Sequence, residues 1–303
     1  MHSNTTSNGA FLIILAGIFW GSMGIFVRGL TALAGFTSVQ IVCLRVTTAA
    51  LIFALILFFK DSSGFRISYR DIPLFLGLGL GSILFFTTCY FTAIRLMTLS
   101  MAAILLYTSP IWVMLLSLLI FHEKITPVKL WALSLSFLGC IFVSGLGSQG
   151  SDVTVTGVLI GLGSGLGYGL YSILGTIALR RYSTYTVTTY TFMTAAAGSL
   201  FICSPTDLLH KITACADKPY LCFLIVLTGL VTAVIPFLLY TLGLTQVEAS
   251  RAAILATVEP MVATLIGIVV FREYLTLLSA LGVLCILSAV VLLNHPSGKH
   301  PSS

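Results

Sequence analysis

Charged side chains are scarce in this sequence. The 303 residues include 15 Lys and Arg and 9 Asp and Glu, or 8% of the chain, whereas soluble domains carry roughly 25%. Hydrophobic residues make up 58%. So little charge cannot cover a water-facing surface, and so much apolar side chain cannot be buried in one core. The composition excludes a soluble enzyme, a disordered chain and a nucleic-acid-binding module, and it predicts a protein embedded in lipid.

Several sequence motifs of metal, redox and ATP chemistry are also missing. The seven cysteines form no CxxC or Cys/His cluster, and no HExxH occurs, so neither a metal site nor a disulfide framework is expected. No GxxxxGK[ST] loop is present, which argues against an ATP-binding domain. The five histidines lie at predicted span ends, in connectors or in tails. We therefore expect no cofactor, and an intramembrane enzyme is only a remote alternative.

Charged residues divide the chain into ten apolar segments. A helix needs about 20 apolar residues to cross a bilayer. Helices are expected because only helices or a closed barrel satisfy the backbone in lipid, and no alternating pattern suggests a barrel. The predicted spans are 10–27, 36–59, 72–94, 98–121, 130–147, 156–179, 185–204, 221–244, 249–271 and 275–293.

Basic residues in the connectors predict the orientation of these spans. If the N-terminus is cytoplasmic, the inner side holds Lys60, Arg66, Arg70, Lys124, Lys129, Arg180, Arg181, Arg251 and Lys299. The outer side holds Arg28, Arg95, Lys211, Lys218 and Arg272. Cytoplasmic connectors usually carry the excess of Lys and Arg. The nine-to-five count predicts a multi-pass protein of the cell membrane with both termini in the cytoplasm.

The sequence matches itself when it is shifted by 150 residues. Matched pairs include Tyr90 and Tyr240, Ser100 and Ser250, Pro110 and Pro260, Glu123 and Glu273, and the runs 102–105 and 252–255. The repeat predicts two units of five helices each, 1–147 and 148–303. Because five is odd, the two units would have opposite orientations, as in many secondary transporters whose substrate site lies between the repeats. The alternative is a duplicated scaffold without transport.

Two of the matched runs resemble a known family signature. They are 252–276 (AAILATVEPMVATLIGIVVFREYLT) and 101–126 (MAAILLYTSPIWVMLLSLLIFHEKIT), and they are similar to the EamA-type family of the drug/metabolite transporter superfamily. The stretch GIFWG at 17–21 and the place of Arg45 fit the same family. The resemblance covers essentially the whole chain. It implies ten transmembrane helices in two inverted five-helix repeats, and transport of small metabolites or amphiphilic compounds.

Two charged side chains fall near the middle of predicted spans. At 1.5 Å per residue, Glu259 lies about 15 Å and Arg45 about 14 Å from the ends of their helices, near the midplane of a ~30 Å core. A charge at this depth costs at least ~2.5–3.5 kcal/mol, so it normally faces a cavity or a partner. Glu259 is a candidate for recognising a substrate cation or carrying a coupling proton, and Arg45 for recognising an anionic group. Alternatively, the two form a structural pair.

Aromatic and polar side chains inside the spans extend this candidate site. Trp and Tyr usually collect at the membrane interfaces, so in-span rings suggest a cavity whose walls bind apolar or cationic groups. The candidate substrate-binding residues are Trp20, Tyr90, Tyr107, Tyr168, Tyr171, Tyr240, Gln40, Arg45 and Glu259. Ordinary helix packing is the alternative for each ring.

Two acidic residues end spans four and nine at matched positions of the repeat. Glu123 is followed by Lys124, and Glu273 is preceded by Arg272. These neighbours favour a salt bridge or cap that holds the turn at the membrane surface. A gate that forms and breaks during transport is the alternative interpretation.

Together these features predict a secondary transporter that works by alternating access. Its expected substrate is a small metabolite, an amino acid or related zwitterion, carried across the cytoplasmic membrane, and a coupling proton is a candidate partner. The alternative is an exporter of small organic cations or amphiphilic drugs, which one carboxylate among aromatic rings would also suit. A channel would require a ring of like polar groups around its pore, and the predicted spans contain no such set.

Overall fold

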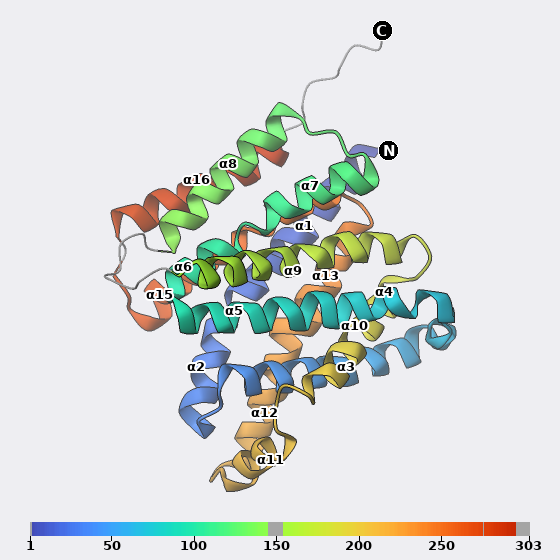
Figure 1. Ribbon diagram of the computed structural model, residues 1–303, viewed down its shortest axis with the longest axis vertical. Coiled ribbons are helices and arrows are strands. Elements are labelled where there is room, and N and C mark those ends of the chain that lie inside the picture. The colour runs from blue at the N-terminus through green and yellow to red at the C-terminus, as the bar shows by residue number, and fades with distance from the viewer. Residues whose placement is uncertain (1, 145–153, 275, 295–303) are drawn as a thin grey trace.

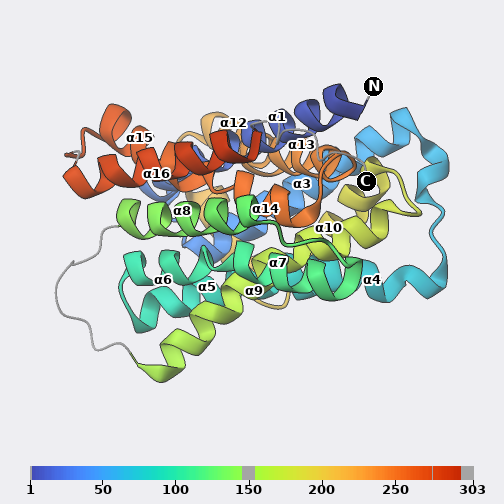
Figure 2. The ribbon, with the colours of Figure 1, turned by 90° about the horizontal axis from the view of Figure 1, so that it is seen from above.

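The protein is a bundle of helices, most of which run along one common direction (Figures 1 and 2). The computed structural model describes residues 2–144, 154–274 and 276–294, and no β-strand occurs within these ranges. The predicted all-helical fold is therefore confirmed for the described part of the chain. Eight of its helical segments are long and apolar enough to cross a membrane: Ser7–Ala34, Ser38–Lys60, Tyr69–Leu96, Leu99–Phe121, Val155–Leu179, Lys218–Leu244, Ala249–Phe271 and Leu277–Asn294.

In the first half of the chain, most of these segments consist of more than one helix. The helices of this half are α1 (His2–Gly21), α2 (Met23–Ala34), α3 (Ser38–Lys60), α4 (Ile72–Leu76), the π-helical η3 (Gly77–Leu84), α5 (Phe85–Leu96), α6 (Leu99–Leu106), α7 (Ser109–Phe121) and the shorter α8 (Pro127–Val143). Two short 3₁₀ turns, η1 (Ser62–Phe65) and η2 (Tyr69–Asp71), connect α3 to α4.

The second half of the chain has a similar series of helices. They are α9 (Val155–Leu179), α10 (Thr184–Ser199), α11 (Pro205–Ala214), α12 (Lys218–Gly229), the π-helical η4 (Leu230–Val234), α13 (Ile235–Leu244), α14 (Ala249–Leu255), α15 (Val258–Phe271) and α16 (Leu277–Asn294). The N-terminus and α4 lie at one end of the bundle, on the right in Figure 2, which we call the terminal end. The opposite end, where α2 meets α11, we call the α11 end.

The structure corrects several predicted span boundaries. The span predicted at 185–204 is shorter, because α10 ends at Ser199 and a separate helix, α11, follows it. The first span is longer than 10–27, because α2 continues to Ala34 and includes Arg28. Arg28 lies in the middle of α2, and its exposed side chain pairs with Glu273.

The predicted count of ten spans remains a prediction. Helices α8 and α10, at the places of predicted spans five and seven, have 17 and 16 residues and are shorter than the eight segments above. The predicted unit boundary at 147/148, the end of the fifth span at Gly147 and the start of the tenth at Leu275 lie outside the described residues.

The helix interruptions recur at the 150-residue shift. The break between α6 and α7 precedes Pro110, and the break between α14 and α15 precedes Pro260. Proline lacks an amide hydrogen and its ring clashes with the carbonyl four residues earlier, so a helix bends or breaks before it. The π-helical segments η3 and η4 also overlap under this shift. Helices α7 and α15 both end in a left-handed residue, His122 and Arg272, each with a φ of 56°.

Helices from the two halves of the chain pack directly against each other. α1 packs on α13 and α15, and α9 packs correspondingly on α5 and α7. α3 lies against α10, and α8 lies against α16. Small residues permit the closest approach: a Cβ on Gly139 of α8 would lie 2.8 Å from the carbonyl oxygen of Gly282 of α16. The halves therefore form one continuous helical body.

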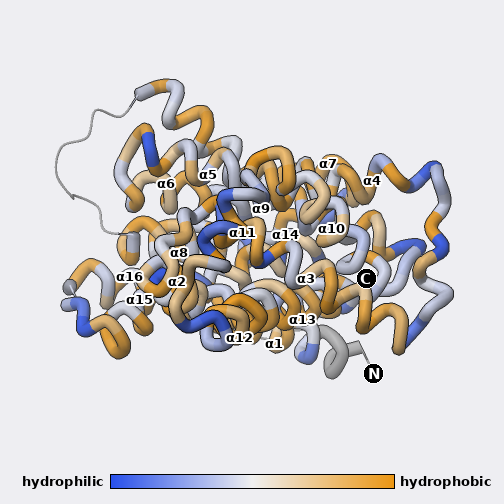
Figure 3. The backbone as a smooth tube through the Cα atoms, turned by 90° about the horizontal axis from the view of Figure 1, so that it is seen from below, coloured by the Kyte–Doolittle hydropathy of each residue, from blue (hydrophilic) through white to orange (hydrophobic). Residues whose placement is uncertain are grey.

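The outside of the bundle is apolar. Hydrophilic residues gather mainly in connectors and at helix ends, whereas hydrophobic residues dominate the helices between them (Figure 3). Many large apolar side chains are exposed, with exposed fractions of 58–77% for Leu51, Leu55, Phe58, Leu119 and Val269. A water-soluble monomer rarely exposes apolar surface on this scale. Lipid is the solvent that suits it.

Two glycines in η3 offer a matched test of this packing. A Cβ on Gly79 would lie 2.6 Å from both the amide nitrogen of Ala195 and the carbonyl oxygen of Thr191, whereas a Cβ on Gly81 would meet nothing within 4 Å. Gly79→Ala should therefore destabilise the purified protein by roughly 1–3 kcal/mol through overpacking. Gly81→Ala should not, since alanine is the better helix former. Equal unfolding temperatures for the two variants would contradict the α10–η3 contact.

Candidate functional site

A central cavity of about 180 Å³ lies where the helix interruptions meet. It is bounded by helices from both halves of the chain, including α1, α3, α5, α9, α13 and α15. Its lining residues are Trp20, Met23, Val42, Arg45, Phe86, Thr87, Tyr90, Phe91, Leu106, Tyr107, Tyr168, Phe237 and Glu259. Six of the nine predicted site residues are therefore in one place: Trp20, Arg45, Tyr90, Tyr107, Tyr168 and Glu259.

Glu259 is positioned by the break between α14 and α15. It occupies the first turn of α15, directly before Pro260, and its side chain lines the central cavity. The hydroxyl of Tyr168, on α9, donates a hydrogen bond of 2.7 Å to Oε2 of Glu259. A carboxylate can accept several such bonds, so a single donor leaves capacity for a cation or for further donors.

Arg45 brings the opposite charge to the same cavity. It lies in α3, is only 4% exposed, and one of its terminal nitrogens is 3.0 Å from the sulfur of Met23. Its Nε has no hydrogen-bond partner among the described residues. The four ion pairs of the described chain include neither Arg45 nor Glu259. The alternative of a direct structural salt bridge between these two residues is thus not what the geometry shows.

Aromatic rings form one wall of the cavity. The ring of Trp20 lies 6.3 Å from that of Tyr168, 5.0 Å from Phe237 and 5.3 Å from Tyr240, measured between centroids. The ring of Phe86 lies 5.2 Å from that of Tyr168 on the other side. Such edge and tilted contacts hold rings rigidly, so they present a fixed apolar surface to a ligand.

Tyr171 and Tyr240 lie behind this wall. They line a neighbouring space of about 20 Å³, which shares Trp20 and Tyr168 with the central cavity. Their hydroxyls are hydrogen-bonded, Tyr171 to Thr241 and Tyr240 to Ser172, each at 2.7 Å. These hydrogen bonds hold the aromatic wall in position, and they already occupy the two hydroxyls with partners inside the protein.

Gln40 lies outside the central cavity and lines a separate space together with Thr37 and Asp207, so its role in substrate binding stays a prediction. Its Oε1 accepts hydrogen bonds from the backbone of Thr37 and from Nζ of Lys211, both at 3.0 Å. Thr37 caps Gln40 in return, so the two residues form a capping box that starts α3. The side chain is therefore used to begin a helix and to attach α11 to it.

Several lining residues were not predicted from the sequence. Met23, Phe86, Phe91 and Phe237 are apolar residues in apolar spans, where lining and packing positions look the same. Phe86 and Phe237 carried a usable signal, because they precede Tyr90 by four and Tyr240 by three residues and therefore share their helix faces.

A row of spaces connects the central cavity to the α11 end. A space of about 250 Å³ shares Val42, Thr87 and Phe91 with the central cavity. A wider space of about 620 Å³ follows, sharing Arg95 and Ile202 with the second. The shared lining residues place the central cavity next to wider spaces on its α11 side.

Comparison with known proteins identifies related chains. The family model described as the EamA-like transporter family matches residues 7–145 and 155–295. An uncharacterized transporter of Archaeoglobus fulgidus is 29% identical over 287 residues, 94% of this chain and 95% of that protein. The threonine/homoserine exporter RhtA of Salmonella typhimurium is 28% identical over 253 residues, 82% of this chain and 79% of that protein. One crystal structure shares the fold, with a TM-score of 0.77 and 18% identity, and covers 94% of this chain and 96% of that one.

Proposed function

The chain belongs to the EamA-like transporter family, and we propose that it exports a small zwitterion, such as an amino acid, by alternating access. Membership of the family makes it a membrane transporter of a small molecule and not an enzyme. The direction and the substrate class are the proposal. They draw on the similarity to RhtA, a threonine/homoserine exporter, and on the charges of the central cavity.

The observation that carries the proposal is the pair of opposite charges in one small cavity. An unpaired, buried guanidinium and a carboxylate with one donor face the same 180 Å³ space. A zwitterion satisfies both at once, since its carboxylate suits the planar fork of Arg45 and its ammonium suits Glu259. Pockets for drug-sized ligands occupy roughly 300–1,000 Å³, so the smaller volume favours a small metabolite.

The second candidate is export of small organic cations. The aromatic wall of Trp20, Tyr168 and Phe86 beside Glu259 would attract a cation by charge and by cation–π contact. Arg45 disfavours this candidate, because a cation would enter a cavity that already contains the positive charge of this guanidinium and would be repelled by it. The zwitterion leaves no such charge unpaired.

The architecture that supports alternating access is ten spans in two inverted units, 1–147 and 148–303. The family model matches the chain twice, once in each unit, and the helix breaks recur at a shift of 150 residues. With the nine-to-five basic count, the terminal end would face the cytoplasm and the α11 end the outside of the cell membrane. The row of spaces would then open the substrate site to the outside.

Glu259 supplies the coupling step in this proposal. An unpaired charge at the depth of the cavity is costly, so the carboxylate is stable either protonated or beside a cation. The ammonium of the substrate and a proton therefore compete for Glu259. Release of the substrate to the outside, followed by protonation of Glu259, would couple export to proton entry.

Counterflow in proteoliposomes tests this function. Vesicles that contain the purified protein and unlabelled threonine should accumulate labelled threonine with saturable kinetics. Homoserine should inhibit the flux, and tetramethylammonium should not. Protein-free vesicles are the control. Flux equal to that control for threonine and homoserine, together with saturable uptake of tetramethylammonium, would reject the zwitterion and support the cation exporter.

A further inference from the structure

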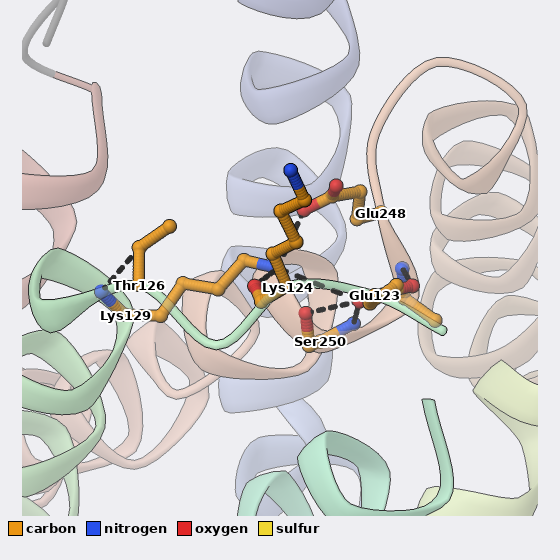
Figure 4. A network of polar contacts seen from close by, with 7 residues as sticks. Glu123, Lys124, Thr126, Lys129, Glu248 and Ser250 are labelled. Carbon is orange, nitrogen blue, oxygen red and sulfur yellow. Dashed lines mark hydrogen bonds and ion pairs between the residues drawn. The ribbon is translucent and has the colours of Figure 1, made fainter. Parts of the chain in front are cut away.

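The carboxylate of Glu123, in the first half of the chain, binds the start of α14, in the second half, at the terminal end (Figure 4). It follows the left-handed turn that ends α7 and extends toward the first residues of α14. Its oxygens accept hydrogen bonds from the backbone nitrogens of Ala249, at 3.1 Å, and Ser250, at 3.4 Å. The hydroxyl of Ser250 donates a third bond to the same carboxylate. Only 11% of the Glu123 side chain is exposed.

Lys129 completes this contact with a buried positive charge. Its Nζ lies 3.6 Å from a carboxylate oxygen of Glu123 and 2.6 Å from one of Glu248, and it also donates to the carbonyl oxygen of Lys124. Lys129 belongs to the first half of the chain, whereas Glu248 and Ser250 belong to the second. We call Glu123, Lys129, Glu248 and Ser250 the Glu123 lock.

The repeat places the positions equivalent to the Glu123 lock at the α11 end, where the glutamate does not bind the start of the facing helix. Glu273 is the counterpart of Glu123, and Ser100 is the counterpart of Ser250. Glu273 is half exposed and pairs with Arg28 at 2.6 Å. The guanidinium of Arg28 in turn lies over the ring of Phe271, 3.8 Å from its centroid. The carboxylate is therefore held beside its own helix and not at the start of α6.

Packing around α6 and α14 shows the same difference between the two ends. α14 packs on α1, α7, α8, α9, α13 and α16, whereas the extensive contacts of α6 among the described residues are with α5 and α9. Leu99, the first residue of α6, is 61% exposed, and its counterpart Ala249 is 1% exposed. One end of the bundle is thus closed around the start of α14, while the other leaves the start of α6 accessible.

From this asymmetry we propose that Glu123 and Glu273 are alternating locks. This inference rests on the proposed alternating access. In the state seen here, Glu123 binds Ser250 and keeps the terminal end closed. In the opposite state, Glu273 leaves Arg28 and binds the start of α6 at Ser100, which closes the α11 end, while Glu123 releases Ser250. The central cavity then opens only toward the terminal end.

The two locks differ in composition, and this difference decides which end of the protein is open when no substrate is bound. The counterparts of Lys129 and Glu248 are Ser279 and Thr98, so the lock at the α11 end has no buried cation. Arg28 also competes for Glu273. The Glu123 lock is therefore the stronger of the two, and the protein without substrate rests with its α11 end open.

Distances between spin labels measure the two states directly. One pair, at Leu99 and Val270, reports on the α11 end, and a second pair, at Lys124 and Thr245, reports on the terminal end. Both are placed in a protein whose native cysteines are replaced and which keeps the unfolding temperature of the native protein. Glu123→Gln should raise the ratio of α11-closed to α11-open molecules at least about tenfold, because a charge-assisted contact is lost from one state only.

The matched variants should shift the same ratio in defined directions. Glu273→Gln should lower it, and Arg28→Ala, which frees Glu273, should raise it. Ser250→Ala, which retains the backbone contacts, should act like Glu123→Gln with a smaller shift and is the fallback if that variant does not fold. Shifts of the same sign for Glu123→Gln and Glu273→Gln, or unchanged distances with a lowered unfolding temperature, would overturn the proposal and leave both residues as structural caps.

The distance measurement is independent of the substrate. Opposite shifts without any threonine counterflow would reject the proposed function and retain the locks. Counterflow without opposite shifts would retain the transporter and reject the locks.

Discussion

Glu259→Gln is expected to leave the protein folded while removing the pH dependence of its transport. The glutamine preserves the shape of the side chain and can still accept the hydrogen bond from Tyr168. It cannot exchange a proton or neutralise an ammonium group. A hydrogen bond to a charged partner contributes about 1.5–3 kcal/mol, so binding of a zwitterion should weaken roughly 10- to 150-fold.

Thermal unfolding and pH-dependent counterflow on one preparation check this prediction. Tyr168→Phe is the matched control, since it removes only the hydrogen bond and should retain the pH profile with weaker binding. If Glu259 merely neutralised Arg45, the glutamine variant would leave a buried charge unpaired and lose roughly 3–5 kcal/mol of stability. A stable variant with an unchanged pH profile would remove Glu259 from the coupling step.

Arg45→Met is expected to weaken zwitterion binding without lowering stability. The guanidinium of Arg45 is buried, forms no ion pair among the described residues and leaves Nε without a partner. Its removal leaves Glu259 without a nearby cation, but the carboxylate can take up a proton while it keeps its bond to Tyr168, so no ionised group need remain unpaired in the cavity. The substrate carboxylate would lose its charged partner, and binding should again fall roughly 10- to 150-fold.

Lys129→Met is the matched comparison, because Lys129 is a buried cation that has two carboxylate partners. Breaking such a pair should cost roughly 3–5 kcal/mol, as both Glu123 and Glu248 lose their cation. Unfolding temperatures and threonine affinities of the two variants distinguish the cases. Equal loss of stability in both would contradict a ligand-binding role for Arg45.

Much of the backbone was predictable from the sequence, because prolines and repeated residues act locally. Pro110 and Pro260 are visible in the sequence as residues that interrupt helices, and a helix break precedes each of them. The in-span charges Arg45 and Glu259 were found because a charge in an apolar run is rare and costly. Helix α11 was not predicted, since its residues 205–214 mix polar and apolar types and merge with the end of the preceding span. The π-helical segments left no signal at all in their apolar sequences.

The partners of several predicted site residues could not be read from the sequence, for one physical reason. Gln40 was assigned to the substrate site on its polarity alone, yet a side chain near a helix start competes for capping partners and here binds Thr37 and Lys211. Tyr171 and Tyr240 were identified as in-span rings, but their hydroxyls found partners within the bundle. Sequence position gives depth in the membrane, whereas the direction of each side chain depends on packing between distant helices.

Equilibrium binding of three related ligands to the purified protein tests the proposed site most directly. Threonine carries both charges, 1-amino-2-propanol lacks the carboxylate, and 3-hydroxybutyrate lacks the ammonium. If Arg45 and Glu259 each hold one end of a zwitterion, threonine should bind at least about tenfold more tightly than either analogue, because each analogue leaves one buried charge unpaired. Equal affinity for threonine and 1-amino-2-propanol would contradict the zwitterion site and assign the cavity to a cation.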